Sequence, residues 1–160
     1  MRSLFLFVFL ACVGLLGYAV YLQEAKNLLP CPLCVVQRIA YWLVGLTALI
    51  AFVHRPSITG RRIYSAFIVL FALAGAVVAA RHAWLLRYPD SVECGVSPEQ
   101  IFLNALPLAK WWPSMFQALG DCTLIKWRFL SLAIPDWSLV WFVIFTGVAG
   151  YLLFAKRARK

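Results

Sequence analysis

Four long stretches of this sequence contain no charged residue. They are residues 4–22, 39–54, 63–80 and 137–155. An α-helix rises about 1.5 Å per residue and needs roughly 20 apolar residues to cross about 30 Å of hydrocarbon, so each stretch can span a bilayer once its ends are counted. The whole chain is 64% hydrophobic and only 13% charged, which is far from the composition of a soluble domain. The sequence therefore predicts an all-α, polytopic membrane protein embedded in a lipid bilayer.

We expect the four transmembrane helices to form a bundle within one membrane domain, residues 1–160. The first stretch follows Arg2 and so also has a feature of a secretory signal peptide. It is longer than the usual signal core of about 7 to 15 residues and lacks a clear small-x-small cleavage pattern, so we expect it to be retained. The predicted helices cover residues 4–22, 35–54, 63–86 and 137–155.

Basic residues are distributed unequally along the chain. The N-terminus, the turn at residues 55–62 and the C-terminal tail together hold eight Lys and Arg residues and no acid, whereas all six acids fall in the other connectors. Short loops rich in Lys and Arg stay in the cytoplasm, so both termini are predicted to be cytoplasmic. Residues 23–34 and 87–136 then face outward, which in a bacterium is the periplasmic side. The net charge of +9 is a topology signal, and we expect no nucleic-acid partner.

Four of the five cysteines lie on the outward connectors. Cys31 and Cys34 form a C-x-x-C on the first connector, Cys94 and Cys122 lie on the second, and Cys12 lies within the first helix. Thiols in an oxidising compartment are expected to form disulfides. Four cysteines allow three pairings, and the sequence leaves the choice open. Cys12 has no charged neighbour and is predicted to be an inert apolar residue.

The stretch "LPCPLCVVQR" places a redox-type cysteine motif at the start of the second helix. Cys34 is expected beside the first helical turn, where unpaired backbone N–H groups and the helix dipole favour negative charge. Arg38 follows four residues later on the same helical face. Both effects favour a reactive thiolate at Cys34, and Cys31 is predicted to be the more exposed partner. The alternative for Arg38 is a side chain that reaches the membrane interface without a functional role.

The stretch "AARHAWL" ends the third helix on the same side. Arg81 and His82 are there at the depth of Arg38, and residues of this kind often lie at the interface simply because they are polar. A cation and an imidazole at one depth are also suited to hold the carbonyl oxygens of a lipid-soluble quinone. Both readings remain open for His82.

The second outward connector is too long for a plain turn. The stretch "SPEQIFLNALP" offers Ser97 as a helix N-cap and Pro98 at the first helical position, which predicts a short amphipathic helix. The stretch "KWWPSMFQALGD" is rich in aromatic residues. It suits either the headgroup zone of the membrane or a lid packed over the bundle.

Taken together, "PCPLCVVQR", "RHAWL", "VECGV", "GDCTLIKW" and "IPDWSLVWF" resemble the DsbB family of disulfide-bond formation proteins. The resemblance extends over residues 4–155, in the family's order. It implies an enzyme, a protein-dithiol:quinone oxidoreductase, which reoxidises a periplasmic DsbA-like thiol oxidase. By that resemblance Cys94 forms the mixed disulfide with the partner, Cys122 resolves it, and Cys31 with Cys34 receives the electrons.

The same resemblance implies a membrane quinone, ubiquinone or menaquinone, as the final acceptor. Cys34 would face the quinone with Arg38 beside it and His82 as a weaker contact. Gln37 occupies a position where some relatives carry an acid, which puts a charged contact there in doubt. A thiol pair is spent after one exchange. Repeated turnover therefore requires a diffusible acceptor such as the quinone.

Parts of the pattern also fit other functions. The protein could be a family paralogue that serves a dedicated partner, or a quinone-linked oxidase of the vitamin K epoxide reductase type, although that type places C-x-x-C at the end of a late helix. A non-enzymatic protein whose disulfides staple its outer loops is a further alternative. A zinc site of all four outward thiols is disfavoured because Cys94 and Cys122 are not a close pair. We therefore expect no metal.

Overall fold

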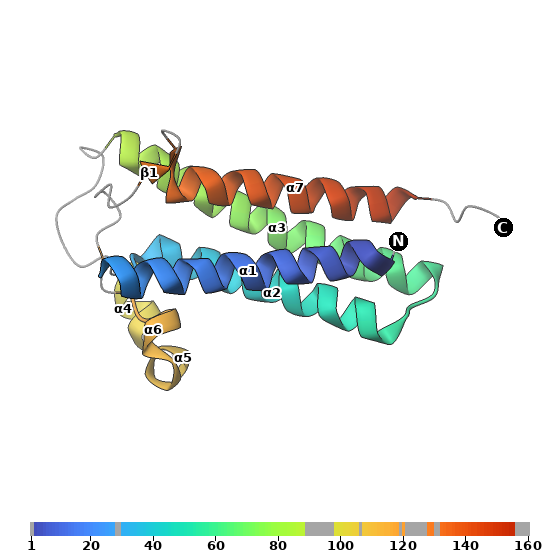
Figure 1. Ribbon diagram of the computed structural model, residues 1–160, viewed down its shortest axis with the longest axis horizontal. Coiled ribbons are helices and arrows are strands. Elements are labelled where there is room, and N and C mark those ends of the chain that lie inside the picture. Colours follow the sequence, from blue (N-terminus) through green and yellow to red (C-terminus); the bar gives the residue numbers. More distant parts are fainter. Residues whose placement is uncertain are drawn as a thin grey trace.

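The computed structural model describes residues 2–27, 30–88, 98–105, 107–118, 120, 128–129 and 132–155. Within these ranges the chain forms four long helices, each apolar and long enough to cross a membrane. The predicted all-α, four-helix membrane architecture is therefore confirmed. Figure 1 shows the four helices side by side along the long axis. They are α1 (Arg2–Lys26), α2 (Pro32–His54), α3 (Ile58–Arg87) and α7 (Ile134–Phe154).

All four helices begin two to five residues earlier than predicted. Three of the predicted starts, at residues 4, 63 and 137, followed the limits of the charge-free stretches, but a charged side chain does not end a helix. Backbone hydrogen bonding continues until a residue cannot adopt helical geometry. In α2 the helix starts at Pro32, where the missing N–H has no consequence, and it is followed by Arg55 in the left-handed conformation with φ of 49°. Only residues 55–57 then separate α2 from α3.

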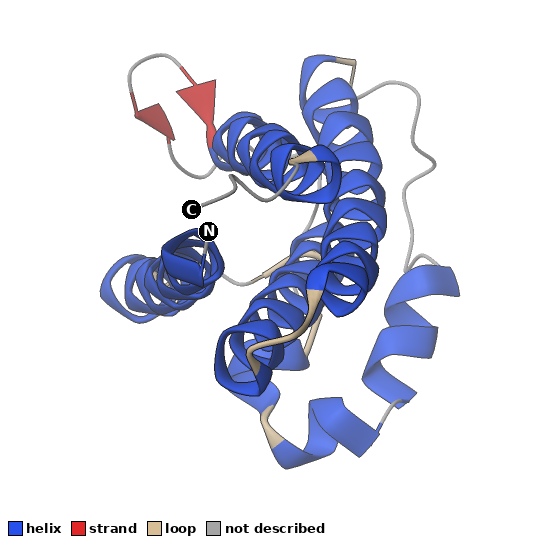
Figure 2. Ribbon diagram, turned by 90° about the vertical axis from the view of Figure 1, so that its right-hand side faces the viewer, coloured by secondary structure: helices blue, strands red, loops and turns tan. Residues whose placement is uncertain are grey.

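The helices pack in the order α1, α2, α3, α7, each against the next, as the end view in Figure 2 shows. Small residues permit the close approach. A Cβ at Gly75 in α3 would lie 2.4 Å from the ring of Phe142 in α7, and one at Gly45 in α2 would lie 3.1 Å from Cβ of Cys12 in α1. Cys12 is buried at this helix contact, which agrees with its predicted apolar packing role.

Large apolar side chains cover the outer faces of the bundle. Leu10 of α1, Val53 of α2 and Val77 of α3 are each more than half exposed, and so is Phe154 of α7. In water such surfaces would be unfavourable, whereas in a bilayer they meet hydrocarbon. The apolar exterior therefore supports the membrane assignment independently of helix length.

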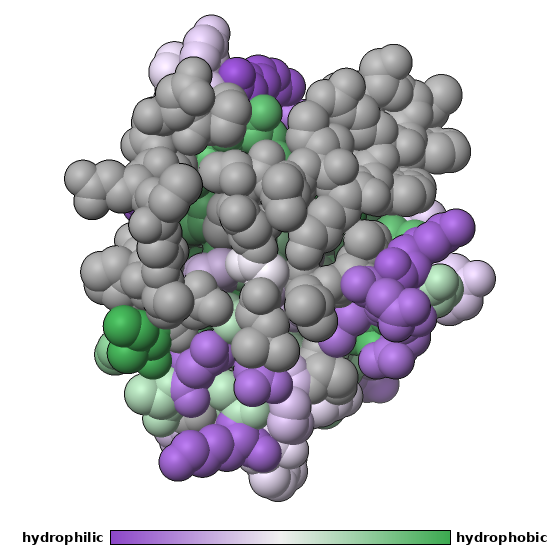
Figure 3. All heavy atoms as spheres, turned by 90° about the vertical axis from the view of Figure 1, so that its left-hand side faces the viewer, coloured by the Kyte–Doolittle hydropathy of each residue, from purple (hydrophilic) through white to green (hydrophobic). Residues whose placement is uncertain are grey.

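The connector between α3 and α7 contains short helices, which lie at the end of the bundle away from the N and C labels in Figure 1. The predicted short helix is present as α4, which starts at Pro98, while Ser97 lies outside the described residues. Hydrophilic residues gather along the margins of this end (Figure 3). The short elements are α4 (Pro98–Ala105), α5 (Pro107–Trp111), α6 (Pro113–Phe116) and the antiparallel strands β1 (Arg128–Phe129) and β2 (Leu132–Ala133).

The aromatic segment combines the two arrangements considered for it. Trp111 is 82% exposed, as expected of a residue at the headgroup level, whereas Met115 is 4% exposed and packs into the bundle core. Leu103 and Ala118 pack against Val35 at the start of α2. The connector therefore forms a lid on α2 that also presents an exposed tryptophan.

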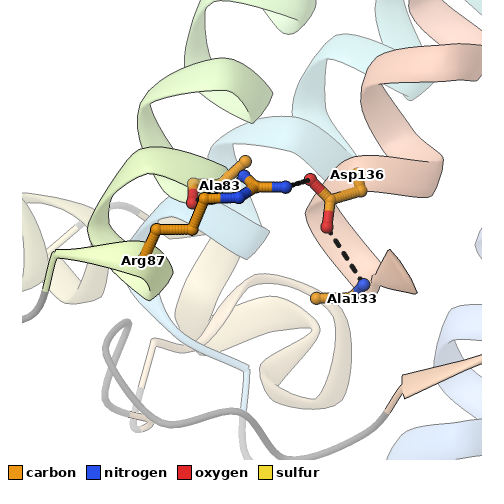
Figure 4. A network of polar contacts seen from close by, with 4 residues as sticks. All are labelled: Ala83, Arg87, Ala133 and Asp136. Atoms are coloured by element: carbon orange, nitrogen blue, oxygen red, sulfur yellow. Dashed lines mark hydrogen bonds and ion pairs between the residues drawn. The ribbon is translucent and has the colours of Figure 1, made fainter. Parts of the chain in front are cut away.

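An ion pair joins the ends of α3 and α7 at the same end of the bundle. Arg87 Nη2 lies 2.9 Å from Asp136 Oδ1, and Asp136 Oδ2 accepts a 3.0 Å hydrogen bond from the backbone N–H of Ala133. Figure 4 shows how the single carboxylate serves both contacts. Asp136 thus fixes the first turn of α7 and links it to α3.

Candidate active site

Cys31 and Cys34 lie at the N-terminal end of α2, as predicted. Cys31 is the N-cap residue, and its sulfur accepts a 3.3 Å hydrogen bond from the backbone N–H of Cys34. Its carbonyl accepts the N–H of Val35 at 3.1 Å. Cys31 Sγ donates to Cys34 Sγ across 2.9 Å, compared with about 2.05 Å in a disulfide. The structure thus presents the pair as two thiols.

The relative exposure of the two cysteines is the reverse of the prediction. Cys31 is buried, at 3% exposure, and Cys34 is of intermediate exposure. The reason is local, because the N-cap position turns the Cys31 side chain back over the first turn of α2. The helix-terminal N–H that was expected to serve Cys34 is donated by Cys34 to Cys31 instead.

His82 of α3 faces both sulfurs. Its Nε2 lies 3.7 Å from Cys31 Sγ, and its Nδ1 lies 4.0 Å from Cys34 Sγ. The ring is 5% exposed. Gln37 Nε2 lies 3.2 Å from Nδ1, so an amide from α2 holds the imidazole. A buried, oriented imidazole next to two thiols can accept or return a proton when they change redox state.

The two residues of the "RH" pair have separate environments. His82 is buried against the thiols, whereas Arg81 is exposed. Successive residues on a helix point about 100° apart, so only one of the two can face the neighbouring helix. The structure thus brings His82, and not Arg81, to the cysteines.

The side chain of Arg38 is directed into the protein. Its Nη1 donates to Gln23 Oε1 at 3.0 Å and to the carbonyl of Met115 at 3.2 Å. The residue is 8% exposed. A side chain that only reached the interface would be solvated instead. Arg38 therefore joins α1, α2 and the lid beside the dithiol.

The lid is fastened close to the cysteines by backbone contacts. Asn104 Nδ2 donates to the carbonyl of Ala118 at 2.9 Å, and the N–H of Ala118 donates to Asn104 Oδ1 at 2.8 Å. Two residues later, the N–H of Gly120 donates to the carbonyl of Pro30 at 2.9 Å. Pro30 immediately precedes Cys31, so the lid is hydrogen-bonded to the chain next to the dithiol.

Two predicted site residues are not described by the structure, and two residues that the structure places at the site were not predicted. Cys94 and Cys122, the predicted second pair, lie outside the described residues. Conversely, the contacts of Gln23 with Arg38 and of Asn104 with Ala118 were not predicted. An uncharged amide at the edge of an apolar span, such as Gln23, is a signal that could have drawn attention to the first of these contacts.

The bundle and this site together define a class of protein. Four membrane-spanning helices carry a C-x-x-C dithiol at a helix N-terminus, with a buried histidine facing both sulfurs. This is the construction of a multi-pass membrane thiol oxidoreductase. The chain matches the family model "Disulfide bond formation protein DsbB" over residues 1–152. It belongs to the DsbB family.

Curated relatives agree with the family assignment. "Disulfide bond formation protein B" of Nitrosomonas europaea is 62% identical over 152 residues, which is 95% of this chain and 93% of the relative. The protein of the same name from Nitrosospira multiformis is 57% identical over 159 residues, 99% of this chain and 95% of the relative. "Disulfide bond formation protein B 1" of Pseudomonas aeruginosa is 40% identical over 158 residues, 98% of this chain and 96% of the relative.

Proposed function

We propose that this protein reoxidises a DsbA-like periplasmic thiol oxidase and passes the electrons through two cysteine pairs to a membrane quinone. The exchange begins at Cys94, Cys122 carries the electrons onward, and the Cys31–Cys34 pair receives them. The observation that carries the proposal is the approach of both His82 ring nitrogens to the two sulfurs, at 3.7 and 4.0 Å. Cysteines that only stapled loops together would need no such neighbour.

The residues at the dithiol suit a quinone. A quinone presents two carbonyl oxygens on an apolar ring, so it needs hydrogen-bond donors next to apolar side chains. Arg38 and His82 carry such donors, and the apolar side chains of Val36 and Ile39 lie on the same part of α2 and are only partly buried. A bound quinone would supply the final two-electron acceptor. Arg38 and His82 would hold it, and His82 would handle the proton of the neighbouring thiol.

We propose further that the dithiol end of the bundle faces the periplasm and that both termini are cytoplasmic. The support is the eight basic residues at the end that carries the termini, compared with six acids among the outward connectors. A membrane-impermeant maleimide added to spheroplasts should label Cys34 in a variant whose other cysteines are serine. Labelling only after detergent lysis would contradict this orientation.

The activity is tested with purified protein, a reduced DsbA-like partner and a short-chain quinone, with quinone loss followed by absorbance. Arg38→Met should raise KM for the quinone more than KM for the partner, because it removes a donor and a charge beside Cys34. Cys94→Ala should abolish use of the partner. Arg62→Met, an exposed arginine near the opposite end of the bundle, is the matched control and should leave both KM values unchanged.

The two variants distinguish the assigned roles. If Arg38→Met and Cys94→Ala failed identically at the partner step, the separation into a partner end and a quinone end would be wrong. If the wild type oxidised other small dithiol proteins but no DsbA-like one, the protein would be a paralogue with a dedicated partner.

A further inference from the structure

The dithiol and His82 form a group of potential metal ligands. Cys31 Sγ, Cys34 Sγ and a ring nitrogen of His82 all lie within 4.8 Å of one another. Two thiolates and one imidazole are a ligand set that Zn²⁺ prefers, and catalytic-type zinc sites commonly use three protein ligands with an open fourth position. Two cysteines separated by two residues is also a common spacing of zinc ligands.

One of the ligand distances already matches what a tetrahedral ion requires. Bonds of about 2.3 Å to sulfur and about 2.0 to 2.1 Å to nitrogen place two sulfurs about 3.8 Å apart and a sulfur and a nitrogen about 3.6 Å apart. Cys31 Sγ and His82 Nε2 are already 3.7 Å apart. The sulfurs, at 2.9 Å, would have to separate by about 0.9 Å to reach the tetrahedral value. Cys34 Sγ lies 4.0 Å from His82 Nδ1, so it would also have to move toward Nε2. Rotation of the partly exposed Cys34 side chain about its Cα–Cβ bond provides this movement.

Gln37 provides the support that a histidine ligand usually has. Metal-bound histidines generally donate the other ring N–H to an oxygen, which fixes the tautomer and the ring orientation. The Gln37 amide lies 3.2 Å from His82 Nδ1. With its amide turned so that Oε1 faces the ring, Gln37 would accept Nδ1–H and leave Nε2 available to the metal, on the side of Cys31.

Charge balance also favours the ion. Metal binding converts the two thiols to thiolates and releases two protons, with no transfer of electrons. Two thiolates neutralise a divalent cation, so the occupied site adds no net charge beside buried Arg38. The disulfide form of the pair lacks the thiolates and cannot bind in this way.

We propose that the reduced Cys31–Cys34 pair and His82 bind one divalent cation of the Zn²⁺ class and that the bound ion prevents oxidation of the dithiol. This site differs from the four-thiol zinc site considered for the sequence, because it uses a histidine and neither Cys94 nor Cys122. It makes the protein susceptible to metal inhibition only in its reduced state. Metal binding does not depend on the identity of the electron acceptor.

The test uses the full-length chain in detergent micelles with Cys94→Ser and Cys122→Ser, so that the dithiol and Cys12 are the remaining thiols. The protein is reduced, freed of reductant and titrated with Co²⁺, whose sulfur charge-transfer absorption reports thiolate ligation, and then with competing Zn²⁺. We expect one ion per chain and no binding after the dithiol has been oxidised with diamide. Bound Zn²⁺ should also slow alkylation of Cys34 by iodoacetamide.

The histidine ligand is tested by variants in the same background. His82→Ala should weaken Zn²⁺ binding at least tenfold, and Gln37→Ala should weaken it by about 10- to 100-fold, as is typical when a supporting hydrogen bond to a metal ligand is lost. His54→Ala removes the other histidine of the chain, near the opposite end of α2, and should leave the affinity unchanged. His82→Cys restores a ligand and should recover binding with stronger charge-transfer absorption.

Two results would overturn the proposal. Equal Zn²⁺ affinity in His82→Ala and the parent would show a dithiol that binds without the histidine. Binding that survives Cys31→Ser would place the ion elsewhere. Circular dichroism of each variant confirms that its helices are intact, and the quinone assay with metal removed shows separately whether the electron-transfer function holds.

Discussion

The pair of hydrogen bonds between Asn104 and Ala118 makes a measurable prediction about how the lid is held over the dithiol. Asn104→Ala removes both bonds, of 2.9 and 2.8 Å, and leaves the remaining lid contacts in place. Each such bond contributes a net stabilisation of about 0.5 to 1.5 kcal/mol, so the closed lid should lose about 1 to 3 kcal/mol relative to the open one. At 1.4 kcal/mol per tenfold change, the open population should rise by about 5- to 140-fold.

Amide hydrogen exchange measures this opening directly. The N–H of Ala118 is buried and bonded to Asn104 in the wild type, so its exchange reports local detachment of the lid. In Asn104→Ala the protection of peptides containing Ala118 should fall by the factor given above. Asn104→Asp keeps the acceptor and loses the amide donor, so its protection should fall to an intermediate value.

The lid also continues to Gly120, which is bonded to Pro30 next to Cys31. Under the proposed electron path, Asn104→Ala should therefore slow turnover with the reduced partner, whereas direct chemical oxidation of the Cys31–Cys34 pair should not be slowed. Unaltered exchange at Ala118 in Asn104→Ala would refute the reasoning, because it would mean that the two bonds do not hold the lid closed.

Three further predictions concern the bundle. Gly75→Ala places a Cβ 2.4 Å from the ring of Phe142 in α7 and should lower the free energy of unfolding by about 1 to 3 kcal/mol through overpacking. The control Gly147→Ala meets nothing within 4 Å and should not lower the free energy of unfolding. Denaturant titration in micelles measures both variants. Cys12→Ala should retain full quinone reductase activity, and loss of turnover would show that this thiol takes part. Asp136→Ala loses both the hydrogen bond to Ala133 and the ion pair with Arg87, whereas Arg87→Met loses only the ion pair. A partly exposed ion pair contributes about 0 to 1 kcal/mol, so Asp136→Ala should lower the melting temperature more than Arg87→Met. Equal shifts in melting temperature would contradict this.

The membrane architecture could be predicted from the sequence because a single physical requirement determines it. A membrane-spanning helix needs an uninterrupted apolar segment of sufficient length, and the four charge-free stretches can be recognised directly in the sequence. The helix ends were harder to predict from the sequence. The helix α3 begins at Ile58 and includes Arg61 and Arg62, which precede its predicted start at residue 63. Arg61 is buried and donates to the carbonyl of Ala155 at the end of α7, a contact between distant segments that the local sequence does not indicate.

The part of the candidate site that depends on the chemical type of its side chains could be predicted from the sequence. The C-x-x-C motif, Arg38 and His82 were identified because thiols, a cation and an imidazole are distinctive at one membrane depth. The exposure of Cys31 was predicted wrongly because the N-cap geometry, and not the motif, directs its sulfur toward His82. The contact of Arg38 with Met115 could not be predicted, since its acceptor is a backbone carbonyl that any residue would provide.

The antiparallel arrangement of α1 and α2 has a practical consequence for spectroscopy. Arg2 donates to the carbonyl of Phe52, so the start of the chain lies nearly the full length of α2 from Cys31. Phe52 is 21 residues after Cys31, so this separation is about 32 Å at about 1.5 Å per residue. A fluorophore attached near Arg2 therefore cannot touch the dithiol, but it lies within the working range of resonance energy transfer to a labelled version of the proposed partner bound at the dithiol end. Energy transfer from this position can therefore report when the proposed partner binds and when it dissociates.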